Sequence, residues 1–206
     1  MTYNITPARK EQASEIAELI MTAMTHECCL YFCSEGYGID DFRKMMTMLV
    51  ESENSQYSYK NAIVATDADH VVGVSVSYDG DKLHQLRAAF IEAAKKYLGA
   101  DHSSIDDETQ AGELYLDSLA VLPSHRHKGI ATKLLYATME RARTLNLPCV
   151  GLLVDKENAT AEALYTSVGF KYQSDSSWGG HPMKHLVIHT HPSDFQQSCG
   201  SPHHGP

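Results

Sequence analysis

The feature that most constrains this chain is an apolar run followed by a basic loop and the start of a helix. Residues 114–122 are mostly apolar, Pro123 ends the run, and helical spacing of apolar residues begins after Gly129. A strand, a loop and a helix in this order direct free backbone N–H groups and the positive end of a helix dipole to one point. Arg126, His127 and Lys128 add donors there. The segment therefore predicts a site for a phosphate or pyrophosphate.

Bulk composition narrows the class of protein. The 206 residues are enough for one domain with a sizeable core, and the formal net charge of −9 disfavours a nucleic-acid surface. No apolar stretch reaches the ~20 residues of a transmembrane helix, and the first nine residues contain no signal-peptide core. The five cysteines lack a paired C-x-x-C pattern, which is typical of reduced thiols. We therefore expect a cytoplasmic protein without membrane or nucleic-acid partners.

Hydrophobic periodicity predicts a mixed α/β (α+β) fold. Helical spacing covers residues 13–24, 40–50, 81–98, 130–143 and 158–167, and strand patterns cover 3–5, 61–66, 71–77, 113–121, 149–154, 170–173 and 183–189. Helices link the strands after residue 113, which implies a parallel crossover, whereas residues 61–77 predict an antiparallel hairpin. We expect a mixed, twisted, mostly antiparallel sheet of roughly six to seven strands, with helices on both faces.

The domain organisation follows from the same patterns. We expect residues 1–191 to form a single domain with a helical insertion at about 81–110, which could act as a lid or only extend the core. The acidic residues at 101 and 106–108 predict an exposed, mobile loop. Residues 192–206 are rich in Ser, Gln, Gly, Pro and His, which predicts a disordered tail.

Further motifs accompany the basic loop in the second half of the chain. They are Leu119-Ala120-Val121 before Pro123, Arg126-x-x-Gly129-x-Ala131, Asn158, and Tyr165 before Gly169-Phe170. In this order they resemble the GNAT N-acetyltransferase superfamily, whose pyrophosphate loop reads [RQ]-x-x-G-x-[GA]. The resemblance implies a GNAT fold that binds acetyl-CoA between two splayed, central parallel strands, here residues 113–121 and 149–154.

The resemblance also implies which residues bind the cofactor. They are Leu119, Ala120, Val121, Arg126, His127, Lys128, Gly129, Ile130, Ala131, Thr132, Asn158 and Tyr165. The N–H of Val121 is a candidate donor to the thioester oxygen. Two of these roles have structural alternatives, because residues 119–121 can be core strand at the same time, and Asn158 can cap its own helix.

The same resemblance suggests the catalytic groups. Tyr165 is the candidate general acid for the departing thiolate, or else a core aromatic residue. Asp117 and Glu113 are the candidate general bases, with Asp117 nearer the thioester and Glu113 able to act through water; either could instead be a hydrogen-bonded strand residue. Tyr115 stands where some members of the family carry the base, which keeps this assignment open.

Acceptor contacts and metals are less constrained. Tyr115, Trp178 and His181 are candidate substrate contacts, the last two in a predicted loop between the final strands. His185, His189 and His191 share strand parity, but we interpret them as a solvated face and expect no metal site.

These features predict an acyl-CoA-dependent N-acetyltransferase. It would move an acetyl group from acetyl-CoA to a primary amine of a small molecule or peptide, by direct attack in a ternary complex. The alternative is a non-catalytic CoA-binding sensor on the same fold. A nucleotide-phosphate enzyme is disfavoured because G-x-x-x-x-G-K-[ST] is absent. The acceptor and the oligomeric state stay open, since edge strands could pair two copies.

Overall fold

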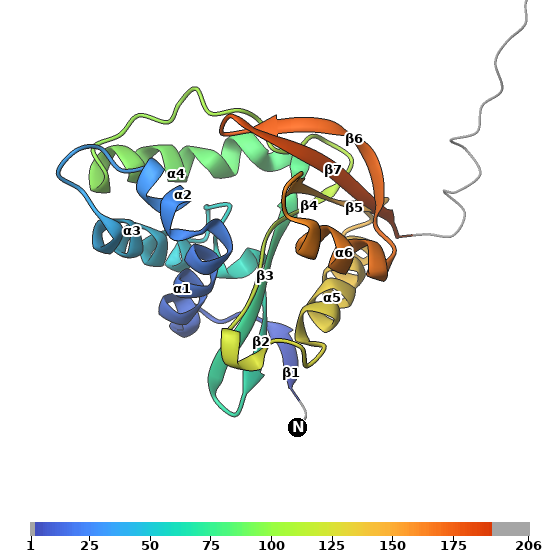
Figure 1. The fold of residues 1–206 in the computed structure, drawn as a ribbon. Coiled ribbons are helices and arrows are strands. Elements are labelled where there is room, and N and C mark those ends of the chain that lie inside the picture. The colour runs from blue at the N-terminus through green and yellow to red at the C-terminus, as the bar shows by residue number, and fades with distance from the viewer. Residues whose placement is uncertain (1–2, 191–206) are drawn as a thin grey trace, which may run out of the picture.

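The computed structural model describes residues 3–190, and these form a seven-stranded sheet flanked by helices (Figure 1). The strands are β1 (Asn4–Pro7), β2 (Ala62–Asp67), β3 (His70–Asp79), β4 (Leu114–Val121), β5 (Cys149–Asp155), β6 (Lys171–Trp178) and β7 (His181–His189). Their order is β1-β2-β3-β4-β5-β7-β6, and every neighbouring pair is antiparallel except β4 and β5. The predicted mixed, mostly antiparallel sheet is confirmed.

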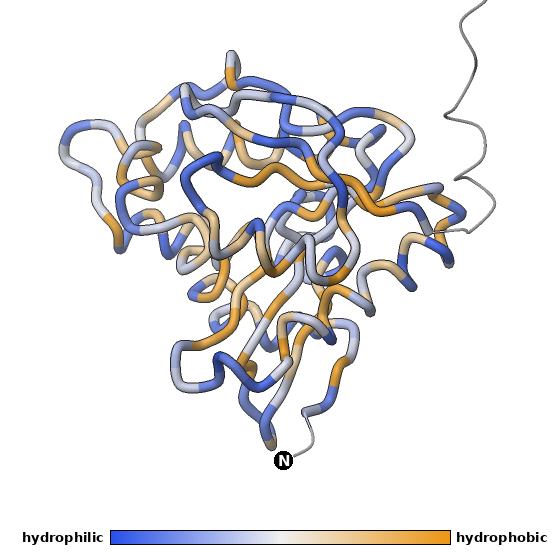
Figure 2. The backbone as a smooth tube through the Cα atoms, turned by 45° about the vertical axis from the view of Figure 1, so that its right-hand side comes forward, coloured by the Kyte–Doolittle hydropathy of each residue, from blue (hydrophilic) through white to orange (hydrophobic). Residues whose placement is uncertain are grey.

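Helices cover both faces of the sheet. They are α1 (Ala13–Met24), α2 (His26–Tyr31), α3 (Ile39–Glu51), α4 (Leu83–Tyr97), α5 (Ile130–Thr144) and α6 (Ala159–Val168). Figure 1 shows α1–α4 on one side of the central strands and α5 and α6 on the other. Within β3, Val74 and Val76 pack in the core of α1 and α3, whereas Val72 packs with α5. Regular alternation would place all three on one face, but β3 has a bulge at Val72, where Gly73 pairs with Ala65 and Val71 pairs with Thr66, and the bulge turns Val72 to the other face. Hydrophobic segments follow the central strands, and the turns are hydrophilic (Figure 2).

The two parallel strands separate soon after they meet. Only Leu114↔Val150 and Tyr115↔Gly151 pair β4 with β5. Beyond these residues β4 remains paired with β3, and β5 with β7. The gap between the carboxyl halves of β4 and β5 leaves backbone groups without partners from the neighbouring strand, as predicted.

The end of the sheet differs from the sequence prediction. Trp178 and His181 lie in β6 and β7 and pair with each other, so the predicted loop is only the turn Gly179-Gly180. Both glycines have positive φ (58° and 80°), which is the backbone that a two-residue hairpin turn requires. The short helix α2 carries Cys28 and Cys29. None of the helices within residues 3–190 has the length and apolar character of a membrane span. The predicted tail, residues 192–206, lies outside the described residues.

Candidate active site

The start of α5 presents a row of unpaired backbone amides. Gly129 caps the helix in the left-handed conformation (φ 75°), and His127 also has a positive φ (61°). The amide of Lys133 is the first in this region to donate within the helix, to the carbonyl of Gly129 (3.1 Å). Among the described residues, no backbone acceptor pairs with the amides of residues 127–132. These donors and the helix dipole form an anion cradle that extends over Ile130, Ala131 and Thr132.

Basic side chains surround this cradle and are exposed. The Nε of Arg126 donates to the carbonyl of Val121 (3.2 Å), and the Nζ of Lys128 donates to the carbonyl of Ser124 (3.0 Å). These bonds hold the loop against the end of β4 while the remaining guanidinium and ammonium hydrogens stay available to an anion. The structure thus brings the predicted loop residues to one point.

In the carboxyl-terminal half of β4, every second residue points its backbone N–H and C=O groups into the gap toward β5. Leu122 donates to the carbonyl of Val72 (2.9 Å), and Val121 lies opposite Gly73. Because an antiparallel ladder alternates bonded and non-bonded pairs, the N–H groups of Val121 and Leu119 point away from β3, whereas Ala120 is bonded to it. Leu119 and Val121 therefore present backbone donors and acceptors where the strands have parted.

Helix α6 contributes the two other residues expected at the cofactor. Tyr165 packs in the core of β4, β5 and α6, with its ring 5.8 Å from that of Phe170. Burial raises the pKa of Tyr165 to about 12, so the phenol keeps its proton at neutral pH. The Oδ1 of Asn158 accepts a hydrogen bond from the backbone amide of Ala161 (3.1 Å), so Asn158 caps α6. The side-chain NH₂ group of Asn158 is not used in this bond. The alternative structural roles of both residues are thus present in the fold.

Asp117 occupies a β-bulge at the point where β4 and β5 diverge. Ser118 pairs with Val76 and Leu116 pairs with Ser77, which leaves Asp117 as the extra residue. Burial is the largest cause that raises the pKa of this carboxyl to about 7, and the nearby Glu108 carboxylate acts in the same direction. The hydroxyl of Ser118 donates to Asp117 (2.8 Å) and opposes the shift. A carboxylate that titrates near neutral pH can accept a proton from an amine.

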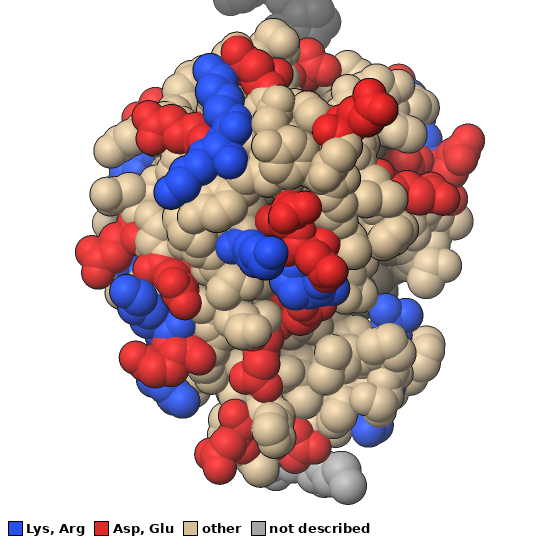
Figure 3. Space-filling model, turned by 90° about the vertical axis from the view of Figure 1, so that its left-hand side faces the viewer, with Lys and Arg blue, Asp and Glu red and all other residues tan. Residues whose placement is uncertain are grey.

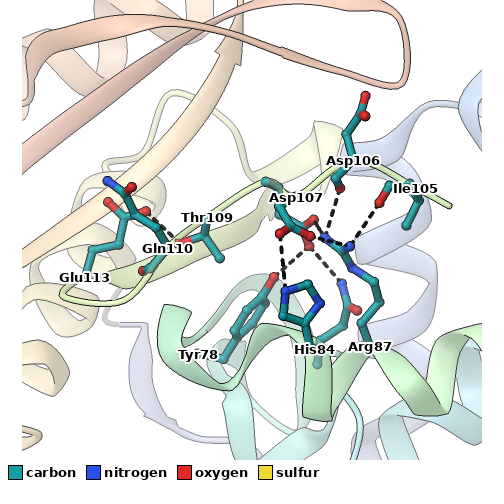
Figure 4. A network of polar contacts seen from close by, with 11 residues as sticks. Tyr78, His84, Arg87, Ile105, Asp106, Asp107, Thr109, Gln110 and Glu113 are labelled. Carbon is teal, nitrogen blue, oxygen red and sulfur yellow. Dashed lines mark hydrogen bonds and ion pairs between the residues drawn. The ribbon is translucent and has the colours of Figure 1, made fainter. Parts of the chain in front are cut away.

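The neighbouring Glu108 belongs to a buried polar network that the sequence analysis missed (Figure 4). Arg87 of α4 pairs with Glu108, and both side chains are almost fully buried. Tyr78 also donates to Glu108 (2.8 Å), and Gln56 does so at 3.4 Å. Asp107 binds Arg87 (2.9 Å) at the rim. The prediction of an exposed, mobile loop is wrong at Glu108, because this network fastens the loop to α4 and β3.

Glu113 is occupied by other contacts. Its Oε1 accepts from the hydroxyl of Thr109 (2.6 Å), and its Oε2 lies 2.8 Å from Nε2 of His185 on β7. The carboxylate fills the space above Gly151, where a Cβ would overlap it. Glu113 is buried and thus ties the loop, β4, β5 and β7 together at the closed end of the gap.

A cleft of about 570 Å³ opens beside α2, and Asp117 is not among its lining residues. Its lining comes from α2, the loop at residues 101–106 and the β6–β7 hairpin, and it includes Trp178 and His181. Cys28 lines the cleft and lies close to Asp117. Burial raises the pKa of the Cys28 thiol, and the charge of Asp117 raises it further.

Tyr115, the third expected acceptor contact, is buried against Tyr78 (ring centroids 5.7 Å apart) and does not line the cleft. Among residues 3–190, no group of His, Cys, Asp or Glu side chains is arranged to hold a metal ion.

The chain is similar to known acetyltransferases in sequence and in structure. A model of the acetyltransferase (GNAT) family matches residues 34–170. No curated protein matches the sequence. A crystal structure of an acetyltransferase has a TM-score of 0.75 and 27% identity, covering 91% of this chain and 100% of that chain. An N-acetyltransferase from Staphylococcus aureus Mu50 has a TM-score of 0.73 and 23% identity, covering 90% and 100%. A PaiA N-acetyltransferase from Thermoplasma acidophilum, in complex with coenzyme A, has a TM-score of 0.53 and 14% identity, covering 90% and 98%.

Proposed function

Because this chain belongs to the acetyltransferase (GNAT) family, we propose that it transfers an acetyl group from acetyl-CoA to a primary amine. The observation that carries the proposal is the position of Asp117. Its carboxyl titrates near neutral pH at the point where β4 and β5 part, and it lies close enough to Cys28, which lines the cleft, to raise the pKa of that thiol. A carboxyl that titrates near neutral pH is matched to the task of a general base, which acyl transfer to an amine can use and binding alone does not require.

The cradle and the open strands support acetyl-CoA as the donor. The six amides at residues 127–132 would hold the pyrophosphate, with Arg126 and Lys128 adding charge. The backbone groups of Leu119 and Val121 that point into the gap would pair with the pantetheine amides. This arrangement would place the thioester beside Val121 and Asp117, at the inner end of the cleft.

The chemistry then divides among three groups. Asp117 takes a proton from the ammonium or from the attacking amine, whose nitrogen forms a bond to the thioester carbon. The N–H of Val121 donates to the carbonyl oxygen as negative charge develops on it, an effect worth about 3 kcal/mol in comparable acyl transfers. Tyr165 gives its proton to the sulfur as the C–S bond breaks. Glu113 has a positioning role here, because its oxygens are held by Thr109 and His185.

The test is release of free thiol from acetyl-CoA in the presence of a panel of amines. We expect turnover that requires both substrates, and thermal stabilisation by CoA but not by ATP. Tyr165→Phe should lower kcat by about a hundredfold while the Kd for CoA stays within about twofold of the parent value. Unchanged kcat in this variant would contradict the acid role. Tight CoA binding without thiol release for any amine would favour the non-catalytic sensor.

A further inference from the structure

The cleft beside Asp117 has an unusual balance of charge. Three acidic residues line it, Glu27, Asp101 and Asp106, and no Lys or Arg is among its lining residues. Asp101 is already bound to Lys95 (3.3 Å). Neither Glu27 nor Asp106 has a side-chain partner within the described part of the chain. Two carboxylates that line the cleft, one from α2 and one from the loop after α4, thus lack counter-ions.

The rest of this side of the molecule behaves differently. Elsewhere on this side of the molecule, Lys and Arg lie beside several of the Asp and Glu side chains (Figure 3), and ion pairs join Arg43 with Glu18 and Lys60 with Glu53. The acidic character of the cleft is therefore a local feature and not the average surface of an acidic protein. A carboxylate that lacks a cation in a partly enclosed site attracts one from solution.

Another part of the cleft lining is aromatic and apolar. Phe32 is buried in its wall, Trp178 lies 6.1 Å from Phe32 between ring centroids, and Ile105 and Cys28 complete this part. Methylene groups pack well on such a surface, and the aromatic faces also favour a nearby cation. A carboxylate on the ligand would meet like charges in the cleft and no Lys or Arg.

These observations extend the proposed function, on which they rest. We propose that the acceptor is an amine that carries a second positive charge and no carboxylate, such as an α,ω-diamine. One nitrogen reaches Asp117, the methylene chain lies along Phe32 and Trp178, and the second ammonium group binds between Glu27 and Asp106.

Matched acceptors test the class directly. We expect kcat/KM to fall at least tenfold from 1,5-diaminopentane to pentylamine, and further to 5-aminopentanoate, which differ only at the distal group. Glu27→Gln and Asp106→Asn should each lower kcat/KM for the diamine about fivefold and leave pentylamine unchanged. Glu35→Gln, which removes an exposed charge outside the cleft, is the control. Equal or better turnover of pentylamine or 5-aminopentanoate would overturn the inference while acetyl transfer stands.

Binding can be measured separately from turnover. Trp178 is the sole tryptophan of the chain and lines the cleft, so its fluorescence reports occupancy by 1,5-diaminopentane. Saturable quenching that weakens in Glu27→Gln supports the cleft assignment even if no thiol is released, in which case only the proposed reaction fails. Absence of quenching by the diamine, together with turnover of other amines, refutes the assignment.

Discussion

Replacing Asp117 by Asn should make the protein more stable and less active. Burial and the charge of Glu108 raise the pKa of Asp117 from 3.8 to about 7. In the unfolded chain the carboxyl ionises near 3.8, whereas in the folded protein it holds its proton until about pH 7. The free energy of unfolding of the parent therefore falls by about 1.4 kcal/mol for each pH unit in this interval.

The whole effect amounts to about 4 kcal/mol above pH 7, and it vanishes below the unfolded pKa. The amide of the Asp117→Asn variant cannot ionise, and its carbonyl can still accept the bond from Ser118. We expect this variant to exceed the parent in unfolding free energy by up to about 4 kcal/mol at about pH 8, and by about 1 kcal/mol at about pH 4.5. The same variant should lose a factor of about 10² to 10⁴ in turnover.

Urea unfolding at the two pH values, followed by circular dichroism, measures the difference. The exposed Asp69→Asn in the β2–β3 turn controls for the general effect of deleting a carboxylate. A stability difference that is the same at both pH values, or a variant less stable than the parent at about pH 8, would refute the reasoning about Asp117. Retained turnover would remove Asp117 from the mechanism while leaving its titration intact.

Three further changes probe the surroundings of the site. Glu108→Gln removes the like charge beside Asp117 and should shift the acid limb of the kcat/KM profile to lower pH; a shift to higher pH would contradict this coupling. Arg126→Ala should raise the Kd for CoA about tenfold in a calorimetric titration and leave kcat at saturation within about twofold, because it removes charge only at the pyrophosphate cradle. Gly151→Ala introduces a Cβ that overlaps the carboxylate of Glu113 and lies 2.8 Å from Nε2 of His185. We expect this substitution to lower the free energy of unfolding in urea by about 2–3 kcal/mol. An unchanged free energy of unfolding would show that the contacts of Glu113 rearrange at little cost.

Local patterns predicted the half of the site that is made of backbone. The strand, loop and helix around Gly129 depend on the residues within them, so their spacing predicts both the cradle and its exposed amides. The ends of β6 and β7 were missed because polar residues such as those around Gly179-Gly180 are typical of a loop, while pairing with the neighbouring strand decides their structure.

The other half of the site depends on side chains that meet from distant segments. Glu108 lies in a polar stretch that is typical of solvent, and only its pairing with Arg87, 21 residues earlier, accounts for its burial. One signal was present: Arg87 follows Leu83 by four positions and precedes Phe90 by three, so it lies on the apolar face of α4. A charged residue at such a position needs a buried partner, but the sequence alone does not say which.

The backbone part and the side-chain part of the site would contribute differently to the proposed reaction. The cradle can bind a phosphorylated donor wherever the strand–loop–helix unit folds, since it uses backbone groups. The pKa of Asp117, by contrast, depends on Glu108, and the charge that Glu108 exerts is offset by Arg87. Without Arg87, the positive charge that lowers the pKa of Asp117 would be lost, and Asp117 would hold its proton to higher pH. In the proposed mechanism, the segment after α4 therefore sets the pH at which the amine is deprotonated and also supplies Asp106 to the cleft, so proton transfer and acceptor choice would depend on the same part of the chain.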